Sequence, residues 1–160
     1  MSLEEELTVS MTVNGERITR LVPVRQHLVD FLRTELGLTG SHIGCEHGIC
    51  GACSVRVDGA VVRGCLMLAV QADGCDVVTI EGLTETGEIA DLQANFVERN
   101  ALQCGYCTPG MLMTAAELLR QGKRVSRDDV RIFLSGNYCR CTGYHAIVDA
   151  VEATLKARFA

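Results

Sequence analysis

The order of hydrophobic and polar positions changes once along the chain. Up to about residue 82, short runs alternate between apolar and polar residues, which is typical of strands with one buried face. From Asp91 onward, apolar residues recur every three to four positions, which predicts helices. We therefore expect an α+β chain with a mixed domain over residues 1–82, a polar linker over 83–90 and an all-α domain over 91–160.

The first domain is predicted to be a small sheet with one helix across it. Asn14-Gly15 and Asp58-Gly59 are turn pairs typical of two-residue hairpins, and alternating residues flank both. In chain order, we expect a hairpin over 7–22, a helix over 25–36, a second hairpin over 54–63, a short helix over 65–70 and a last strand over 77–80.

The second domain is predicted to contain four helices joined by short links, which suggests a four-helix bundle. Pro109 suits the first turn of the second helix, and Ser126 is a good N-cap for the third. In the first of these helices, Leu92, Phe96 and Val97 are expected to face inward. The helices are expected over residues 91–101, 109–121, 126–136 and 144–159.

Composition excludes several classes of function. The 160 residues include 15 Lys and Arg against 20 Asp and Glu, so the net charge is −5, and tryptophan is absent. Without a basic run or an aromatic platform, we expect no binding to nucleic acid or to anionic membrane surfaces. The acidic start, MSLEEELTVS, does not resemble a signal peptide, and no apolar run is long enough to span a membrane. The chain has nine cysteines, and we expect it to be cytoplasmic and to use cysteines to bind metal rather than to form disulfides; the odd count leaves at least one cysteine outside any set of four.

Four cysteines in the first domain follow the pattern C-x4-C-x2-C-x11-C: Cys45, Cys50, Cys53 and Cys65. The first three have the spacing of plant-type ferredoxins, in which four thiolates hold a [2Fe-2S] cluster. Glycines interleaved with these cysteines allow the backbone to fold closely around the cluster. A zinc site is the alternative, but structural zinc sites usually use two short cysteine pairs.

The second domain carries a further set of four cysteines, in two pairs that each precede a predicted helix: Cys104, Cys107, Cys139 and Cys141. Helix N-termini favour the negative charge that such a set acquires. Two short pairs also occur in zinc sites, although one intervening residue between Cys139 and Cys141 is tight for zinc. From the residues alone, zinc and a second cluster remain alternatives. Cys75 belongs to neither set and is interpreted as a free thiol in a surface turn.

Three motifs, GCEHGICGACSV, QCGYCTPGM and GNYCRCTGY, make the whole chain similar to the small iron–sulfur subunit of the molybdenum hydroxylases, the xanthine oxidase family. Fused xanthine oxidases usually carry GCGEGGCGAC where this chain has GCEHGICGAC. The chain therefore resembles more the separate small subunits of bacterial hydroxylases, of the carbon monoxide dehydrogenase and N-heterocycle-oxidising kind. It ends at Ala160, soon after the last expected helix, so we expect no fused flavin or molybdenum domain.

The resemblance implies a β-grasp, plant-ferredoxin-like first domain and a helical second domain, each with one [2Fe-2S] cluster. It implies an oxidoreductase subunit that relays electrons singly from a molybdopterin centre in a large subunit to FAD in a medium subunit. The second cluster would lie nearer molybdenum and the first nearer the flavin. No residue of this chain would convert substrate, and relatives assemble as dimers of heterotrimers.

The resemblance also assigns individual residues. Gln103 matches a glutamine that contacts the pterin cofactor, and its alternative role is to cap a backbone group. His47 could form a hydrogen bond to a cluster sulfur, or it is an exposed loop residue.

Two other functions fit the residues: a free-standing two-cluster ferredoxin-like carrier, and a zinc-binding structural module. A hydrophobic fraction of 48% indicates apolar surface for partners, which favours the subunit over the free carrier.

Overall fold

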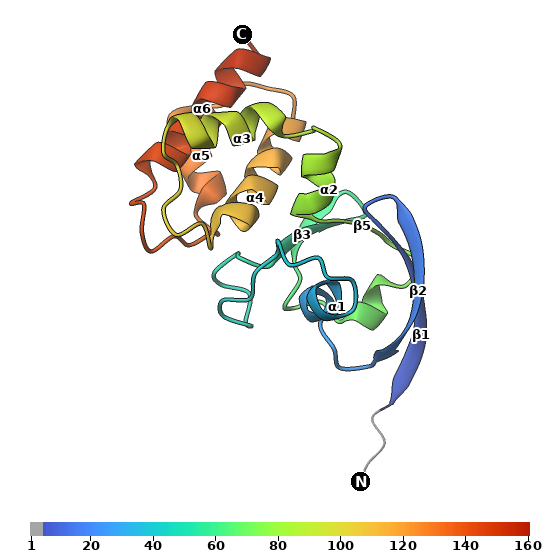
Figure 1. Cartoon of the computed structure of the whole chain (residues 1–160). Helices are drawn as coiled ribbons and strands as arrows, with labels where there is room; N and C mark the ends of the chain where they lie inside the picture. The colour runs from blue at the N-terminus through green and yellow to red at the C-terminus, as the bar shows by residue number, and fades with distance from the viewer. Residues whose placement is uncertain (1–4) are drawn as a thin grey trace.

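A computed structural model describes residues 5–160 as a sheet-containing part followed by a helical part (Figure 1). The first four residues of the acidic N-terminal stretch, on which the signal-peptide expectation partly rests, lie outside this description. Across residues 5–160, no helix combines the length and hydropathy needed to cross a membrane. The expected α+β composition is confirmed.

The sheet is mixed and has the strand order β2-β1-β5-β3-β4. β1 and β5 run parallel, whereas the other neighbouring strands are antiparallel. Both predicted hairpins are confirmed, and Asn14 and Gly15 both have the positive φ that a tight turn of this kind requires. The strands are β1 (Glu6–Val13), β2 (Glu16–Pro23), β3 (Ser54–Val57), β4 (Ala60–Arg63) and β5 (Asp76–Val78).

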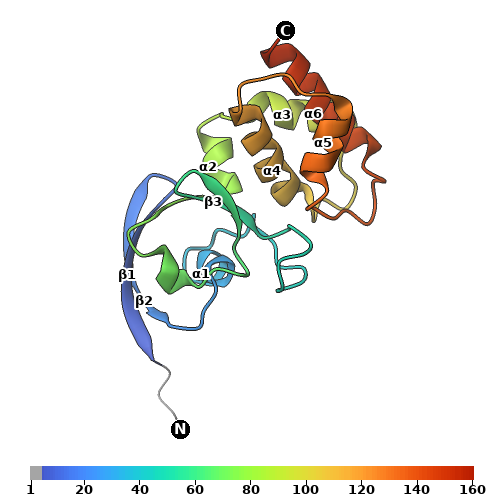
Figure 2. The same cartoon turned by 180° about the vertical axis from the view of Figure 1, so that it is seen from behind.

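One helix, α1 (Leu28–Thr34), packs against a face of this sheet (Figures 1 and 2). Phe31 and Leu32 of α1 are fully buried, and they share a hydrophobic core with Val9, Met11 and Val13 of β1. This alternation is what the sequence pattern of the first hairpin predicts. The α1 helix begins later than the predicted residue 25, because His27 forms an isolated bridge with Leu68 before it, and it ends at Thr34 rather than at residue 36.

The segment after β4 differs from the prediction. No α-helix forms over residues 65–70; a short 3₁₀ helix, η1 (Ala69–Ala72), follows instead. The reason is backbone pairing, because the N–H of Leu28 donates to the carbonyl of Met67 and holds that segment against the start of α1. The prediction of a helix over 65–70 was therefore wrong.

The predicted last strand, residues 77–80, is also only partly correct. β5 ends at Val78, and Ile80 begins a helix, α2 (Ile80–Glu85), that the sequence pattern did not indicate. Ile80 and Leu83 are buried in the hydrophobic core of the helical part. Only one side of this short helix is apolar, and polar residues follow Leu83, so the sequence pattern indicates a linker there instead.

The four helices predicted for the second half are confirmed to within a few residues. Ser126 caps its helix as predicted, since its Oγ accepts a hydrogen bond from the N–H of Asp129 at 3.1 Å. The helices are α3 (Ala90–Glu98), α4 (Thr108–Arg120), α5 (Arg127–Leu134) and α6 (His145–Arg158).

One predicted core residue in α3 is exposed. Leu92 and Phe96 are buried against α6, but 71% of Val97 is accessible to solvent. Val97 follows Phe96 directly, so it points about 100° away around the helix and misses α6. The prediction that Val97 faces inward was therefore wrong.

The sheet and the helical part are in direct contact. α4 packs against β3 and β4, and Figure 2 shows α4 and β3 from behind. The buried Arg56 of β3 forms an ion pair with Glu88, just before α3, at 2.7 Å. Arg120, at the end of α4, donates to the carbonyl of Gly59 at 2.7 Å. These contacts fix the orientation of one part relative to the other.

Phe96 and Val97 provide a matched test of this packing within one helix. We expect Phe96→Ala to lower the free energy of unfolding by about 3–5 kcal/mol, because it leaves a cavity between α3 and α6. We expect Val97→Ala to change it by less than about 0.5 kcal/mol, because the side chain is exposed. Urea denaturation of the full chain measures both, and an equal loss in the two variants would contradict the packing of α3.

Candidate metal centres

The first set of cysteines comes together in the loop between α1 and β3 and at the end of the β3–β4 hairpin. Cys53 and Cys65 are buried and pack together against Val29 of α1. Cys45 and Cys50 are half-buried, and the N–H of Cys50 donates to the Cys45 Sγ at 3.3 Å. The thiols of Cys45 and Cys50 also interact directly, as do those of Cys53 and Cys65. The four thiols thus form two pairs, which fits a [2Fe-2S] cluster because each iron takes two terminal thiolates.

The environment differs between the half-buried outer sulfur of Cys45 and the buried inner sulfur of Cys53. Backbone N–H groups of Cys50, His47 and Ile49 lower the pKa of the Cys45 thiol to about 6. Burial raises the pKa of the Cys53 thiol to about 11; the Cys65 thiol adds to this effect, and the backbone N–H of Cys65 opposes it. Backbone amides therefore stabilise the outer thiolate, whereas a bound metal would have to stabilise the inner one.

Close approach of the backbone explains two of the glycines in this loop. A Cβ on Gly44 would lie 2.9 Å from the Cys50 Sγ. A Cβ on Gly51, which has a φ of +76°, would lie 2.6 Å from the side-chain nitrogen of Asn137 in the helical part. The glycine pattern that the sequence analysis associated with close folding therefore has a direct steric reason.

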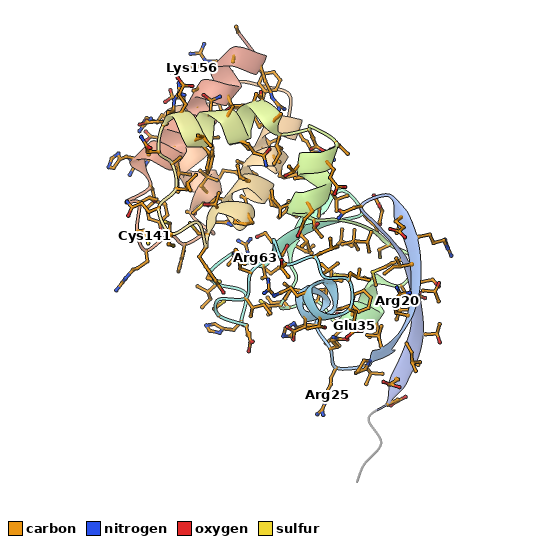
Figure 3. The ribbon with its side chains drawn as sticks, in the orientation of Figure 1. Arg20, Arg25, Glu35, Arg63, Cys141 and Lys156 are labelled. Carbon is orange, nitrogen blue, oxygen red and sulfur yellow. The ribbon has the colours of Figure 1, made fainter. Side chains whose placement is uncertain are left out.

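The second set of cysteines also forms two pairs. Cys104 and Cys107 come from the loop before α4, and Cys139 and Cys141 come from the loop before α6. The Sγ atoms of Cys104 and Cys141 are 3.6 Å apart, and the thiols of Cys107 and Cys139 interact in the same way. Cys104 and Cys141 are exposed, and Figure 3 shows Cys141 at the outer edge of the helical part.

The inner pair of this second site is electrostatically unequal. Burial raises the pKa of the Cys107 thiol to about 12, and Cys139 beside it adds to the rise. Burial also acts to raise the pKa of Cys139, but hydrogen bonds from the Thr142 side chain and from backbone N–H groups outweigh it and lower that pKa. The Thr142 Oγ1 lies 3.1 Å from the Cys139 Sγ. Cys139 is therefore the better thiolate of the pair.

A buried polar cluster joins the two sites. The Asn137 side chain is 2% exposed; its Nδ2 donates to the carbonyl of Gly51 at 3.2 Å, and its Oδ1 accepts from the hydroxyl of Thr114 at 3.0 Å. The N–H of Tyr138 donates to the carbonyl of Cys50 at 2.8 Å. Asn137 and Tyr138 directly precede Cys139, so each ligand loop is attached to the other.

Two further side chains support this junction. Arg63 of β4, labelled in Figure 3 between the two parts, donates to the carbonyl of Gly136 at 2.7 Å. The rings of His42 and Tyr106 stack with their centroids 4.5 Å apart. The sequence analysis missed Asn137, Arg63 and Thr142. A polar residue beside a predicted ligand was the available signal, but its partners lie far away in the sequence.

The remaining predicted residues lie as follows. Gln103 is exposed beside Cys104. The side chain of His47 is exposed, while its backbone N–H faces the sulfur of Cys45. Cys75 precedes β5 and lies in neither site, and burial together with Asp58 raises the pKa of its thiol.

Comparison with known proteins agrees with the two sites. Residues 11–76 match the family described as "2Fe-2S iron-sulfur cluster binding domain", and residues 79–152 match the family described as "[2Fe-2S] binding domain". Caffeine dehydrogenase subunit gamma of Pseudomonas sp. (strain CBB1) is 50% identical over 148 residues, which are 91% of this chain and 89% of that protein. The chain belongs to the family of small iron–sulfur subunits of molybdenum hydroxylases.

Three further proteins are similar over most of this chain, and they differ in how much of their own length is matched. The nicotine 6-hydroxylase small subunit of Paenarthrobacter nicotinovorans is 48% identical, over 94% of this chain and 90% of that subunit. A chain of quinoline 2-oxidoreductase from Pseudomonas putida 86 superposes with a TM-score of 0.90 at 48% identity, covering 96% of each chain. In aldehyde oxidoreductase from Desulfovibrio gigas, the matching region is 16% of a longer polypeptide, with a TM-score of 0.82 at 43% identity.

Gly51 and Gly74 provide a matched test of the junction, because both have nearly the same positive φ, +76° and +78°. Alanine at either position should cost about 1–2 kcal/mol for the left-handed backbone. A Cβ at Gly74 meets nothing within 4 Å, whereas one at Gly51 meets Asn137. We therefore expect Gly51→Ala to cost at least about 1 kcal/mol more, from overpacking.

Denaturation of both alanine variants, with iron determined on the same samples, tests the junction. We expect Gly51→Ala to lose iron and Gly74→Ala to retain it. Equal stability and equal iron content would contradict the tight junction at Gly51.

The thiols of the first site should differ in their pH dependence in the metal-free chain. Because the pKa of Cys45 is about 6, its alkylation rate should rise with pH, reach half its maximum near pH 6 and be constant above pH 7. Cys53, with a pKa of about 11, should remain protonated and unreactive throughout that range. Iodoacetamide labelling mapped by mass spectrometry measures both, with circular dichroism to verify the fold. A midpoint for Cys45 near an ordinary thiol pKa of about 8.5 would contradict the amide environment described above.

Proposed function

We propose that this chain is the electron-transfer subunit of a molybdenum hydroxylase and carries two [2Fe-2S] clusters. Cys45, Cys50, Cys53 and Cys65 hold the first cluster, and Cys104, Cys107, Cys139 and Cys141 hold the second. The chain passes electrons, one at a time, from a molybdopterin centre in a large subunit to FAD in a medium subunit. Family membership and the pairing of the thiols at both sites support this assignment.

The observation that carries the proposal is the direct attachment of the two ligand loops. The carbonyl of Cys50 accepts a hydrogen bond from the N–H of Tyr138 at 2.8 Å, and Tyr138 is covalently bound to Cys139. A ligand of the first site is thus connected to a ligand of the second by one hydrogen bond and a few covalent bonds. A relay needs such neighbouring sites, whereas a structural metal site in either part does not.

The chain's own residues bind and protect the redox groups. A [2Fe-2S] cluster supplies a one-electron couple whose potential depends on burial, charge and hydrogen bonds to its sulfurs. The backbone N–H groups around Cys45 and the hydroxyl of Thr142 beside Cys139 stabilise negative charge at those sulfurs. The buried Cys53 and Cys65 exclude water from the inner side of the first site. The chain itself performs no substrate chemistry.

Exposed apolar residues support a subunit rather than a free carrier. The chain has three tyrosines, and all of them lie in the loops of the second site. The exposed fractions of Tyr106, Tyr138 and Tyr144 are 48%, 56% and 37%. Exposed aromatic residues are typical of interfaces with partner proteins. Ile49 and Leu66 are exposed beside the first site. We propose that the second site faces the molybdenum subunit, with Gln103 contacting the pterin, and that the first site faces the flavin subunit.

We further propose a division into a ferredoxin-like domain over residues 1–82, a linker over 83–90 and a helical domain over 91–160 in which α3–α6 form a four-helix bundle. Two separate hydrophobic cores support two domains, and the packing of Ile80 and Leu83 in the helical core would move the boundary toward Thr79. By analogy with the family, we propose a cytoplasmic dimer of heterotrimers.

Electron paramagnetic resonance tests the cluster assignment directly. We expect the dithionite-reduced full chain to give two distinct [2Fe-2S] signals, with four iron and no zinc per chain. Cys53→Ser should remove only the first signal and Cys139→Ser only the second. Cys75→Ser is the matched control and should leave both signals intact. One signal together with one zinc per chain would show that the second set is a structural zinc site, and the relay would then be excluded.

A further inference from the structure

The loop that precedes α6 closes on itself through side-chain hydrogen bonds. The hydroxyl of Thr142 donates to the Cys139 Sγ at 3.1 Å. The N–H of Tyr144 donates to the Thr142 Oγ1 at 3.2 Å, and the N–H of Cys139 donates to the Tyr144 hydroxyl oxygen at 2.9 Å. Cys139, Thr142 and Tyr144 therefore form a hydrogen-bonded ring, in which each residue contacts the other two.

The ring determines where the hydroxyl hydrogen of Thr142 points. A hydroxyl has one hydrogen to donate and lone pairs that accept. Because the Thr142 Oγ1 accepts from the N–H of Tyr144, its own hydrogen is directed to the other neighbour, the sulfur of Cys139. A ligand sulfur is deprotonated and can only accept, so the bond persists when Cys139 binds metal.

The backbone of the loop is shaped to keep this arrangement. Tyr144 has a φ of +69°, which is uncommon for a residue with a side chain. That conformation places its N–H against Thr142 and its hydroxyl against the N–H of Cys139. Among residues 5–160, Thr142 is the side chain whose hydroxyl donates to a sulfur of the eight predicted ligands.

We propose that Thr142 raises the reduction potential of the second cluster through its hydrogen bond to Cys139. This inference rests on the proposed function, in that the second set of cysteines holds a [2Fe-2S] cluster. Reduction adds one electron, and part of the added negative charge resides on the ligand sulfurs. A hydroxyl that donates to one of those sulfurs stabilises the reduced form more than the oxidised form, which raises the potential. Thr142 is thus a positioning residue that acts through Cys139.

The test is a redox titration of the full chain in which the electron paramagnetic resonance signal of each cluster is measured at each potential. Thr142→Val keeps the shape of the side chain and removes the hydroxyl. We expect it to shift the one-electron equilibrium of the second cluster about tenfold toward the oxidised form, which corresponds to a potential about 59 mV lower. The first cluster should not change. Thr142→Ser retains a hydroxyl and should restore the wild-type potential.

Thr84→Val is the matched control for the substitution itself. Thr84 lies in α2, and its hydroxyl donates to the carbonyl of Ile80 rather than to a sulfur. It should leave both potentials unchanged. A Thr142→Val variant with two intact signals and a wild-type second potential would overturn the role of Thr142, while a wild-type chain without a second [2Fe-2S] signal would overturn the proposed function.

If Thr142→Val does not take up the second cluster, Thr142→Ala replaces it, because alanine removes the hydroxyl without adding a methyl group. If Thr142→Ala also lacks the second signal, the proposal is tested on the wild-type chain. The reduced second cluster of the wild type should show a strongly coupled proton in electron–nuclear double resonance that disappears after brief exchange into D2O, as expected for a hydroxyl. Absence of such a proton would overturn the proposal.

Discussion

The attachment of the two ligand loops through Asn137 and Tyr138 is the interaction on which the rest of this structure depends. A buried side-chain amide without hydrogen-bond partners lowers the stability of the fold. Asn137 avoids this penalty because its amide donates to the carbonyl of Gly51 and accepts from the hydroxyl of Thr114. Those partners lie on β-rich and helical parts that fold around separate cores. Displacing one loop would therefore leave buried polar groups unpaired in both parts, which ties the two sites to one relative placement.

The structure brings together the cysteines that the sequence groups into two sets, while their role as ligands stays a prediction. Cys45, Cys50 and Cys53 lie in one loop, and the geometry of that loop limits what it can bind. Both hairpins and the four later helices were predicted for a similar reason, since turn pairs and periodicity act over a few residues. Here local chemistry and the final structure agree.

What the sequence does not reveal depends on contacts between distant residues. Ile80 begins a helix because the helical core accepts its side chain, which no neighbouring residue indicates. The exposure of Val97 follows from where α6 packs, and the roles of Arg63 and Asn137 follow from the junction of the two parts. Thr142 is an intermediate case, because its partner is only three residues away. It could be recognised only once the conformation of Tyr144 was known.

The two sites solve the problem of holding negative charge in different ways. At the first site, backbone N–H groups from Cys50, His47 and Ile49 converge on the half-buried Cys45, and this arrangement does not depend on which side chains occupy those positions. At the second site, a side-chain hydroxyl contributes at Cys139 in addition to backbone N–H groups. A backbone donor cannot be removed by a single substitution, but a hydroxyl can. If each site holds a cluster as proposed, substitution at Thr142 changes the potential of the second cluster and leaves the donors at the first site in place, so that the driving force between the two sites depends in part on this side chain.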